Sequence, residues 1–329
     1  ERVGSYMKDV GIIFDNSGKG GGVYNQLVVN VMKEKFNINT YEVIRSQRNK
    51  LYNFSKLYYN LSKLHGRRDV WIRTSNSVIT LPFDNTQGKN VAIIHHIDNS
   101  IKPVSTRVLS DLLDKVLIRN LSLVDKIVVV SQFWKEYFEA LGYGSIEVIY
   151  NPFYLEEFAF SDDDIDKFKA KYQLSGKPII YLGNCQRAKG VVEAYEALKG
   201  LDAHLVTSGA KDVDLPATHL NVSYREYLML LRASSVAVTM SKFNEGWCRT
   251  AHEAMLCKTP VVGSGKGGMR ELLEGGKQII CQDFSKLRDC VEYAMSDSKL
   301  GEAGYAFASQ DCYTIEFFKN KWVDLVNGL

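Results

Sequence analysis

Short runs of β-branched and apolar residues recur along the chain, and their spacing constrains the fold more than any other feature. In the first half, most runs are separated by enough residues for a crossover helix, which implies a parallel sheet covered by helices on both faces. We expect strands at Val10–Phe14, Val70–Arg73, Val91–Ile94, Lys126–Val130 and Ile146–Ile149. We also expect a helix from about Val23 to Lys35 after the first strand.

The same pattern starts again after a polar, Asp-rich segment at residues 158–171, which we interpret as a hinge. A helix is expected at Val191–Leu198. Strands are expected at Pro178–Leu182, His204–Thr207, Val236–Thr239, Pro260–Val262 and Gln278–Ile280. The predicted fold class is therefore α/β, with two Rossmann-like, doubly wound domains facing a cleft. In such sheets ligands bind beyond the carboxyl ends of the strands, so the loops there are the first places to search for a site.

Length and composition agree with two domains. The chain has 329 residues, of which 45% are hydrophobic and 24% charged, as in a soluble globular protein. No run approaches the roughly 18 apolar residues of a membrane span. The six cysteines form no CxxC pair, so a zinc site is not expected and reduced thiols in a cytoplasmic protein are the simplest interpretation.

Charge is unevenly distributed between the halves. Residues 1–150 carry 20 Lys and Arg against 14 Asp and Glu, whereas the remainder carries 21 against 24. A mildly basic first half suits an anionic partner, either a membrane surface or a phosphorylated substrate. The excess is too small to indicate nucleic acid, and no nucleic-acid-binding motif is present.

Three glycine-rich loops follow predicted strands. The first, with Gly21 and Gly22, lacks a complete G-x-G-x-x-G, since residue 23 is Val. This disfavours NAD binding and leaves a simple tight turn almost as well supported as a ligand loop. The second, residues 183–190, places Arg187 and Lys189 beside a helix N-terminus. That arrangement suits a diphosphate, although two solvated loop cations explain it equally well. The third spans residues 263–271.

Two glutamates stand at the start of an apolar helix. Glu245 lies in a loop after a predicted strand, where a carboxylate is a good candidate for a binding site. Glu253 lies in the first turns of the helix, and Thr250-x-x-Glu253 fits a capping box. Glu253 therefore either caps the helix or contacts a ligand.

The run from Ser241 to Val262, with its two glutamates, the helix and the Pro-Val-Val strand, resembles the signature of the family-4 retaining glycosyltransferases. Residues 265–271, 125–131 and 146–152 resemble further segments of that family, in the same order. The resemblance implies the GT-B architecture. It also implies an N-terminal acceptor-binding domain at residues 1–153, a nucleotide-sugar-binding domain at 154–312, and a C-terminal helix at 313–329 that crosses back to the first domain.

The resemblance also implies roles for individual residues. Glu253 would bind the ribose hydroxyls of the donor, and Glu245 would lie near its sugar, beside the N–H groups of residues 246–249. Lys189 would contact the diphosphate, and His96 would act near the sugar and acceptor, so that Glu245, Lys189 and His96 form the catalytic set. The remaining donor-binding candidates are Arg187, Gly183, Gly21, Gly22, Trp247, Cys248, Arg249 and Thr250, and Asp98 and Asp15 are placed on the acceptor side.

This chain departs from the family pattern at three positions. Asn184 stands where the family often has Arg, and we infer that Arg187 reaches the same phosphate. Cys248 and Arg249 replace Gly and an aliphatic residue, which leaves the donor sugar open.

No cofactor and no metal are expected. Lys189, Arg187 and backbone N–H groups would stabilise the departing diphosphate of a UDP- or GDP-sugar as its negative charge grows. The one run resembling a metal motif, residues 162–166, is interpreted as solvated linker charge. His95 is expected to be a strand-end histidine bound to backbone carbonyls.

Residues 49–68 have apolar residues at helical spacing with basic residues among them. Packing on the domain's own sheet is the preferred interpretation. The alternative is peripheral contact with the inner face of a membrane that presents a lipid-linked acceptor.

The expected function is a retaining transfer of a hexosyl or related sugar to a hydroxyl of a glycan or lipid-linked acceptor. Two alternatives stay open: a sugar-nucleotide epimerase of similar fold, and a non-catalytic glycan- or nucleotide-binding module.

Overall fold

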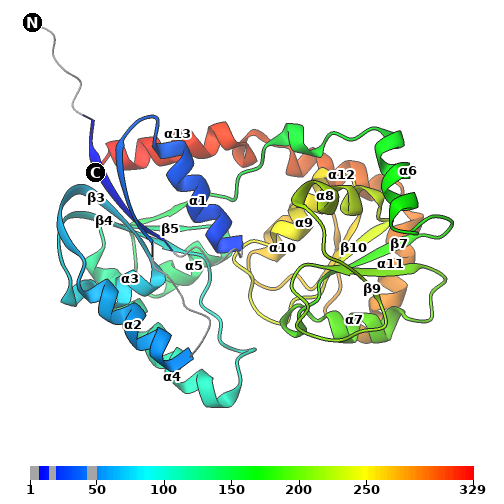
Figure 1. Ribbon diagram of the computed structural model, residues 1–329, viewed down its shortest axis with the longest axis horizontal. Coiled ribbons are helices and arrows are strands. Elements are labelled where there is room, and N and C mark those ends of the chain that lie inside the picture. Colours follow the sequence, from blue (N-terminus) through cyan, green and yellow to red (C-terminus); the bar gives the residue numbers. More distant parts are fainter. Residues whose placement is uncertain (1–6, 15–19, 43–49) are drawn as a thin grey trace, which may run out of the picture. The chain divides into compact units, whose positions relative to one another are not determined.

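A computed structural model describes residues 7–14, 20–42 and 50–329 of the chain (Figure 1). Asp15 and Asn49 therefore lie outside the described residues. Contacts divide the chain into two units: unit 1 comprises Glu1–Pro152 with Ile315–Leu329, and unit 2 comprises Phe153–Thr314. Each unit contains a six-stranded parallel sheet between helices, so the predicted α/β class with two doubly wound domains is confirmed.

The sheet of unit 1 has the strand order β2-β1-β3-β4-β5-β6. Its strands are β1 (Asp9–Phe14), β2 (Asn37–Glu42), β3 (His65–Thr74), β4 (Asn85–Ile94), β5 (Lys126–Val129) and β6 (Ile146–Val148). Strand β2 was not predicted, because its sequence is largely polar and it occupies the edge of the sheet. An edge strand needs no continuous apolar run, since it is not enclosed by strands on both sides.

The helices of unit 1 within the described residues are α1 (Gly20–Met32), α2 (Lys50–Ser62), α3 (Ser75–Ile79), α4 (Val104–Asn120), α5 (Gln132–Ala140) and α13 (Ile315–Asn327). Short 3₁₀ turns occupy Leu81–Phe83 and Leu121–Leu123. Helix α13 packs against α1, although nearly the whole chain separates them in sequence (Figure 1). The ring of Phe318 meets Tyr24 edge-on at 5.2 Å, and Trp322 is fully buried.

Helix α2 packs on the sheet of its own unit. Leu57 and Leu61 are buried in one cluster with Ile13 of β1 and Trp71 of β3. The preferred interpretation of this amphipathic segment is thus confirmed for the helix, which ends at Ser62 before β3 begins. Among the described residues, none of the helices combines the length and apolar content that crossing a bilayer requires.

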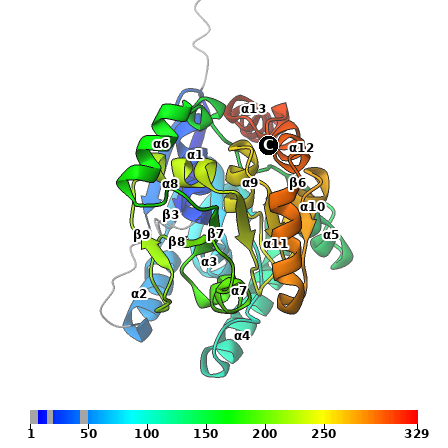
Figure 2. The same ribbon diagram turned by 90° about the vertical axis from the view of Figure 1, so that its right-hand side faces the viewer.

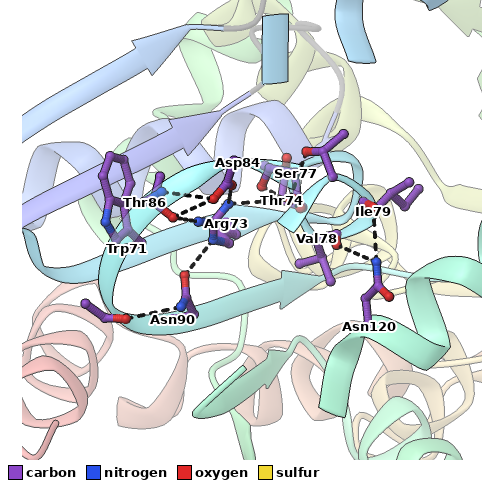
Figure 3. A network of polar contacts seen from close by, with 12 residues as sticks. Trp71, Arg73, Thr74, Ser77, Val78, Ile79, Asp84, Thr86, Asn90 and Asn120 are labelled. Carbon is purple, nitrogen blue, oxygen red and sulfur yellow. Dashed lines mark hydrogen bonds and ion pairs between the residues drawn. The ribbon is translucent and has the colours of Figure 1, made fainter. Parts of the chain in front are cut away.

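A buried ion pair joins β3 to the segment before β4 (Figure 3). The fully buried Arg73 donates to Asp84 Oδ2 at 2.8 Å, to Asn90 Oδ1 at 2.6 Å and to Thr86 Oγ1 at 2.5 Å. Burial lowers the pKa of Arg73, and the charge of Asp84 opposes that effect. Because its guanidinium is engaged by side chains of its own unit, we assign this arginine to the framework of the sheet.

The sheet of unit 2 has the order β12-β11-β10-β7-β8-β9. Its strands are β7 (Ile179–Asn184), β8 (His204–Ser208), β9 (Thr218–Leu220), β10 (Val236–Thr239), β11 (Val261–Gly263) and β12 (Ile279–Ile280). Its helices are α6 (Asp162–Lys171), α7 (Val191–Leu198), α8 (Tyr224–Ala233), α9 (Arg249–Leu256), α10 (Met269–Gly275), α11 (Leu287–Ser296) and α12 (Lys299–Ala308). The 3₁₀ turns are η3 (Leu155–Phe158), η4 (Arg187–Lys189), η5 (Phe284–Lys286) and η6 (Asp311–Tyr313).

Helices α7 and α11 bury their apolar residues against one face of this sheet, on Ile180, Leu182 and Val238. Helices α8 and α9 lie on the other side, as Figure 2 shows when unit 2 is viewed end-on. The short β9 was not predicted, since three residues give too little pattern.

The interpretation of residues 158–171 as a hinge is wrong. Most of this segment forms α6, which packs on α8 and buries Ile165 and Phe168. Ser161 and Asp164 form a capping box at its start. The aspartates are favourable there because a helix N-terminus attracts negative charge. The Asp-rich composition therefore reflects a helix start rather than a flexible linker.

Candidate functional site

Lys189 and Glu245 form a partly buried ion pair in unit 2. Lys189 ends turn η4 after β7, and Glu245 lies in the loop after β10, the strand that pairs with β7. The two carboxyl ends are therefore neighbours, and Lys189 Nζ lies 2.5 Å from Glu245 Oε1. The Ser241 hydroxyl donates to the same oxygen. Burial works against the charged form of Lys189, but Glu245 outweighs it and the pKa of Lys189 is raised. The side chain is therefore a cation at neutral pH.

The glycine-rich loop after β11 holds the backbone of Glu245. Gly268 N–H donates to the Glu245 carbonyl at 2.9 Å, and Glu245 N–H donates to the Lys266 carbonyl at 3.3 Å. Gly267 has φ +64°, and a Cβ there would lie 2.4 Å from the Glu245 carbonyl oxygen. Only glycine fits both the left-handed backbone and this close approach. The loop thus fixes the position of the carboxylate.

A second close approach fixes the turn that carries Lys189. Gly190 has φ +71°, and a Cβ there would lie 2.3 Å from the Met240 carbonyl oxygen. The N–H of Lys242 donates to the Ala188 carbonyl at 3.0 Å. The cationic turn after β7 is therefore held against the segment after β10.

Two other predicted residues lie in or near this turn. Gly183 is buried with φ +83°, within the irregular end of β7. Arg187 begins the turn and is exposed. Burial works to raise the pKa of the Glu193 carboxyl, but the Lys242 ammonium and, to a smaller extent, the Arg187 charge lower it overall.

Glu253 is buried in α9 and receives three hydrogen bonds from residues that the structure describes. Tyr227 Oη donates to its Oε2 at 2.9 Å, Tyr224 Oη to Oε1 at 3.2 Å, and Arg249 Nη2 to Oε1 at 3.3 Å. The capping-box alternative for this residue is wrong: the N-cap is Cys248, and Thr250 is the second residue of the helix. Sequence reasoning missed the two tyrosines, which precede the helix by more than 20 residues and sit on α8.

The two residues that depart from the family pattern lie at the start of α9. Arg249 places its guanidinium over the Phe153 ring at 4.4 Å while pairing with Glu253. Burial, followed by the charge of Glu245, raises the pKa of Cys248 to about 12, so this thiol stays protonated. Thr250 is half-buried and hydrogen-bonds to Tyr227.

Trp247 is oriented into unit 2 rather than away from it. Its indole N–H donates to His252 Nδ1 at 3.1 Å, and His252 Nε2 lies 2.9 Å from the Ala308 carbonyl oxygen. These contacts require a neutral His252 with its proton on Nε2. Burial accordingly lowers the pKa of His252 to about 3. The side chain of Trp247 therefore supports α9 from inside unit 2. Contact with a ligand is left to its backbone.

The predicted residues of unit 1 gather at the start of α1 and the end of β4. Gly21 and Gly22 belong to the first turn of α1, and a Cβ at Gly21 would lie 3.1 Å from the His95 ring. His95 Nε2 contacts Asn25 Oδ1 at 3.3 Å, so its partner is a side chain and not the expected backbone carbonyl. Burial, with a smaller effect from His96, lowers the pKa of His95 to about 3.

His96 is exposed, just beyond β4. Asp98 accepts from the Ser100 N–H at 2.7 Å. The neighbouring Asn99 donates to Asp111 Oδ1 at 2.9 Å and to Asp114 Oδ2 at 2.5 Å, both on α4. Sequence reasoning assigned no role to this amide or its two carboxylates, which hold the loop against α4.

Comparisons with known proteins agree with this architecture. Residues 162–306 match a family model described as "Glycosyl transferases group 1". No match is found among curated proteins.

Solved structures match over 98% of this chain. Sucrose-phosphate synthase from Thermosynechococcus elongatus has a TM-score of 0.78 at 16% identity, with 98% of its chain covered. The Anabaena protein HepE in complex with UDP-glucose has a TM-score of 0.74 at 16% identity, with 100% covered. A UDP-forming trehalose-phosphate synthase from Burkholderia xenovorans has a TM-score of 0.69 at 14% identity, with 99% covered. The chain thus has the GT-B fold of these proteins.

Proposed function

We propose that this protein is a glycosyltransferase that moves a sugar from a nucleotide-sugar donor to a hydroxyl group, with retention of the anomeric configuration, as in family 4. The observation that carries the proposal is the ion pair of Lys189 and Glu245 at the carboxyl ends of two adjacent strands. It lies within the segment 162–306 that matches the glycosyltransferase family model.

The chemistry of the donor explains why a cation is needed there. Breaking the anomeric C–O bond leaves negative charge on the departing diphosphate, and a fixed cation stabilises that charge as it develops. Lys189 is held in place by Glu245, and its side chain is 28% exposed. Arg187, on the same turn, supplies a second charge, and the backbone N–H groups at the start of α9 supply further donors.

Glu253 is proposed to accept hydrogen bonds from the ribose. Its carboxylate has three donors among the described residues, and a carboxylate has about four acceptor positions, so a sugar hydroxyl can still be accommodated. Because HepE was solved with UDP-glucose and UDP, UDP-sugars are the first donors to test, followed by GDP-sugars. No cofactor or metal enters this proposal.

Unit 1 is proposed to bind the acceptor, a glycan or a lipid-linked sugar. His96 and Asp98 at the end of β4, together with Asp15, would contact the reacting hydroxyl, and Gly21 and Gly22 would approach the diphosphate.

If the acceptor is lipid-linked, basic residues within 49–68 would support peripheral contact with the inner face of a membrane. Flotation with anionic vesicles at low salt tests this contact, and a protein that stays with the soluble fraction would rule it out.

The decisive experiment combines a donor screen with one matched pair of variants. A bound donor raises the unfolding temperature by mass action, so thermal shifts with a panel of nucleotide-sugars identify it. Release of the nucleotide diphosphate is then measured with candidate acceptors. Lys189→Ala should lower kcat by about 10²–10³-fold, as for loss of one transition-state donor.

The matched control is Lys177→Ala. Lys177 also pairs with a carboxylate at 2.5 Å, on Asp202, but both side chains are largely exposed. Its replacement should leave kcat unchanged. Equal activity of the two variants would refute the proposed role of Lys189.

The two alternatives predict different outcomes. An epimerase would interconvert nucleotide-sugars without an acceptor, whereas a transferase releases nucleotide diphosphate only when an acceptor is present. A non-catalytic module would bind a donor and turn over nothing. Nuclear magnetic resonance of the product's anomeric proton distinguishes retention from inversion.

A further inference from the structure

An open cavity of about 350 Å³ lies in unit 2, at the carboxyl end of β12, and it is separate from the Lys189–Glu245 pair. Two cations, Arg270 of α10 and Lys286 of η5, contribute to its lining. Two cysteines line it as well: Cys281, which directly follows β12, and Cys290 of α11. The proposed transfer reaction uses none of these four side chains.

The two thiols line the same cavity and are close enough to interact. The Cys290 side chain is one of the groups that raise the pKa of Cys281. Cys281 is buried and its Sγ–H donates to the Asp283 carbonyl at 3.2 Å, whereas Cys290 is half-buried. Two neighbouring thiols on separate elements, one of them reachable from solvent, meet the first requirement for a disulfide, which is proximity.

The surroundings give the two sulfurs different roles. Burial, with the contact from Cys290, raises the pKa of Cys281 to about 11, so this sulfur is a thiol at neutral pH. Cys290 is half-buried and opens to the cavity, so a peroxide can reach its sulfur. Cys290 is therefore the sulfur that reacts first, and Cys281 the one that follows.

We propose that Cys281 and Cys290 are a redox modification site, which a peroxide converts into a reversible disulfide. The Cys290 thiolate attacks one peroxide oxygen, the O–O bond breaks, and hydroxide leaves, which gives a sulfenic acid. The Cys281 sulfur, on losing its proton, attacks the Cys290 sulfur, the S–S bond forms and the S–O bond breaks. With hydrogen peroxide, two thiols are oxidised, the peroxide is reduced, and the thiol protons end in two molecules of water. A small dithiol reverses the reaction by exchange.

The disulfide would be connected to the candidate site through the backbone. Cys281 N–H donates to the Gly263 carbonyl at 2.8 Å, at the start of the glycine loop. The preceding Ile280 packs so closely on Gly265 that a Cβ there would lie 2.9 Å from its side chain. The same loop holds the Glu245 backbone through Gly267. Drawing the end of β12 toward α11 would therefore displace the support of Glu245.

Mass spectrometry of the protein tests the proposal. The protein is reduced, freed of reductant, exposed to hydrogen peroxide and alkylated before digestion. We expect a linked pair of peptides carrying Cys281 and Cys290, lighter by two hydrogens than the reduced pair, and loss of that link after dithiothreitol.

Single variants separate the two steps. Cys281→Ser should accumulate a Cys290 sulfenic acid that dimedone traps, and Cys290→Ser should keep a reduced Cys281. Cys312→Ser removes a half-buried thiol elsewhere in unit 2 and should form the disulfide as the wild type does. If a variant folds poorly, detection of the linked peptides in the wild-type protein still tests the proposal. Wild-type protein that oxidises at Cys290 to sulfinic acid, or at neither residue, without forming the link would overturn the proposal.

The effect on turnover is a separate measurement that rests on the proposed function. Oxidised protein should transfer sugar more slowly than the same sample after dithiothreitol, and Cys290→Ser should lose this difference. If the disulfide forms in a protein that has no transferase activity with any donor, the redox site stands and the proposed function fails.

Discussion

Glu253 illustrates how a buried carboxylate is supplied with hydrogen-bond donors from two different helices. Its two oxygens are shared among two phenols and one guanidinium. Tyr227 is the more enclosed of the two tyrosines, because Tyr224 is 46% exposed. Burial, followed by the charge of Glu253, raises the pKa of Tyr227 and keeps its hydroxyl a donor.

We therefore expect removal of the two phenol hydroxyls to lower the free energy of unfolding by unequal amounts. Tyr227→Phe should lower the free energy of unfolding by about 1.5–3 kcal/mol, the usual cost of a lost hydrogen bond to a charged group. Tyr224→Phe, on the same carboxylate, should cost less, because water can replace an exposed donor. Urea unfolding of both variants measures the difference. Equal losses would contradict this account of how Glu253 is stabilised.

His252 makes the stability of unit 2 dependent on pH. Its pKa is about 3 in the folded state against 6.5 for an ordinary histidine, so only the unfolded state takes up its proton between these values. The contribution of neutral His252 to the free energy of unfolding is therefore fully present above pH 6.5 and is lost as the pH falls toward 3. Proton linkage predicts that the free energy of unfolding falls by about 2 kcal/mol between pH 7.5 and pH 5.

Comparing urea unfolding at these two pH values in wild type and His252→Gln measures that loss. The variant is less stable at pH 7.5, since it breaks the contacts to Trp247 and Ala308, but its stability should fall less on acidification. An identical fall in both proteins would show that His252 does not carry the linkage.

At the scale of elements, the loop between β11 and α10 shows how glycine sets a functional side chain. Gly267→Ala must place a methyl group against the Glu245 backbone at a positive φ. We expect the free energy of unfolding to fall by at least about 3 kcal/mol, because the steric clash adds to the backbone strain. We also expect loss of activity. Gly176→Ala is the matched control: its φ is +85°, and within the described part of the chain no neighbouring atom lies within 4 Å of the added Cβ. This variant should lower the free energy of unfolding by about 1 kcal/mol and leave the activity unchanged. Urea unfolding and kcat of the two variants decide this.

The elements also show where sequence patterns succeed. Helix α7 has the predicted bounds, Val191–Leu198, because its apolar residues face one side of an enclosed sheet. Residues 158–171 were misread because the acidic residues that stabilise the first turn of α6 also give linkers their composition. Strand β2 carries no apolar run because it lies at a sheet edge.

At the scale of the whole molecule, a two-unit chain allows the location of donor binding to be measured directly. Ligand binding suppresses local opening in the part that it contacts. If the donor binds mainly to unit 2, a saturating nucleotide should slow hydrogen exchange in β10, α9 and the loop at 263–268 more than in α2 or β2 of unit 1. Stronger protection of the unit 1 elements would refute the assignment of the donor to unit 2.

The sequence by itself determined the architecture and one part of the candidate site. Parallel strands that are covered on both faces require continuous apolar runs, and glycines are required where two backbones approach closely. Both features can therefore be recognised in the local sequence. The sequence also placed Lys189 and Glu245 after strands. Only the tertiary structure decided what those residues contact: β10 pairs with β7, which brings Lys189 and Glu245 together. In the same way α8 brings Tyr227 to Glu253, and α11 brings Cys290 to Cys281. Partners distant in sequence leave no local pattern, because the distance between them is set by strand order and helix packing.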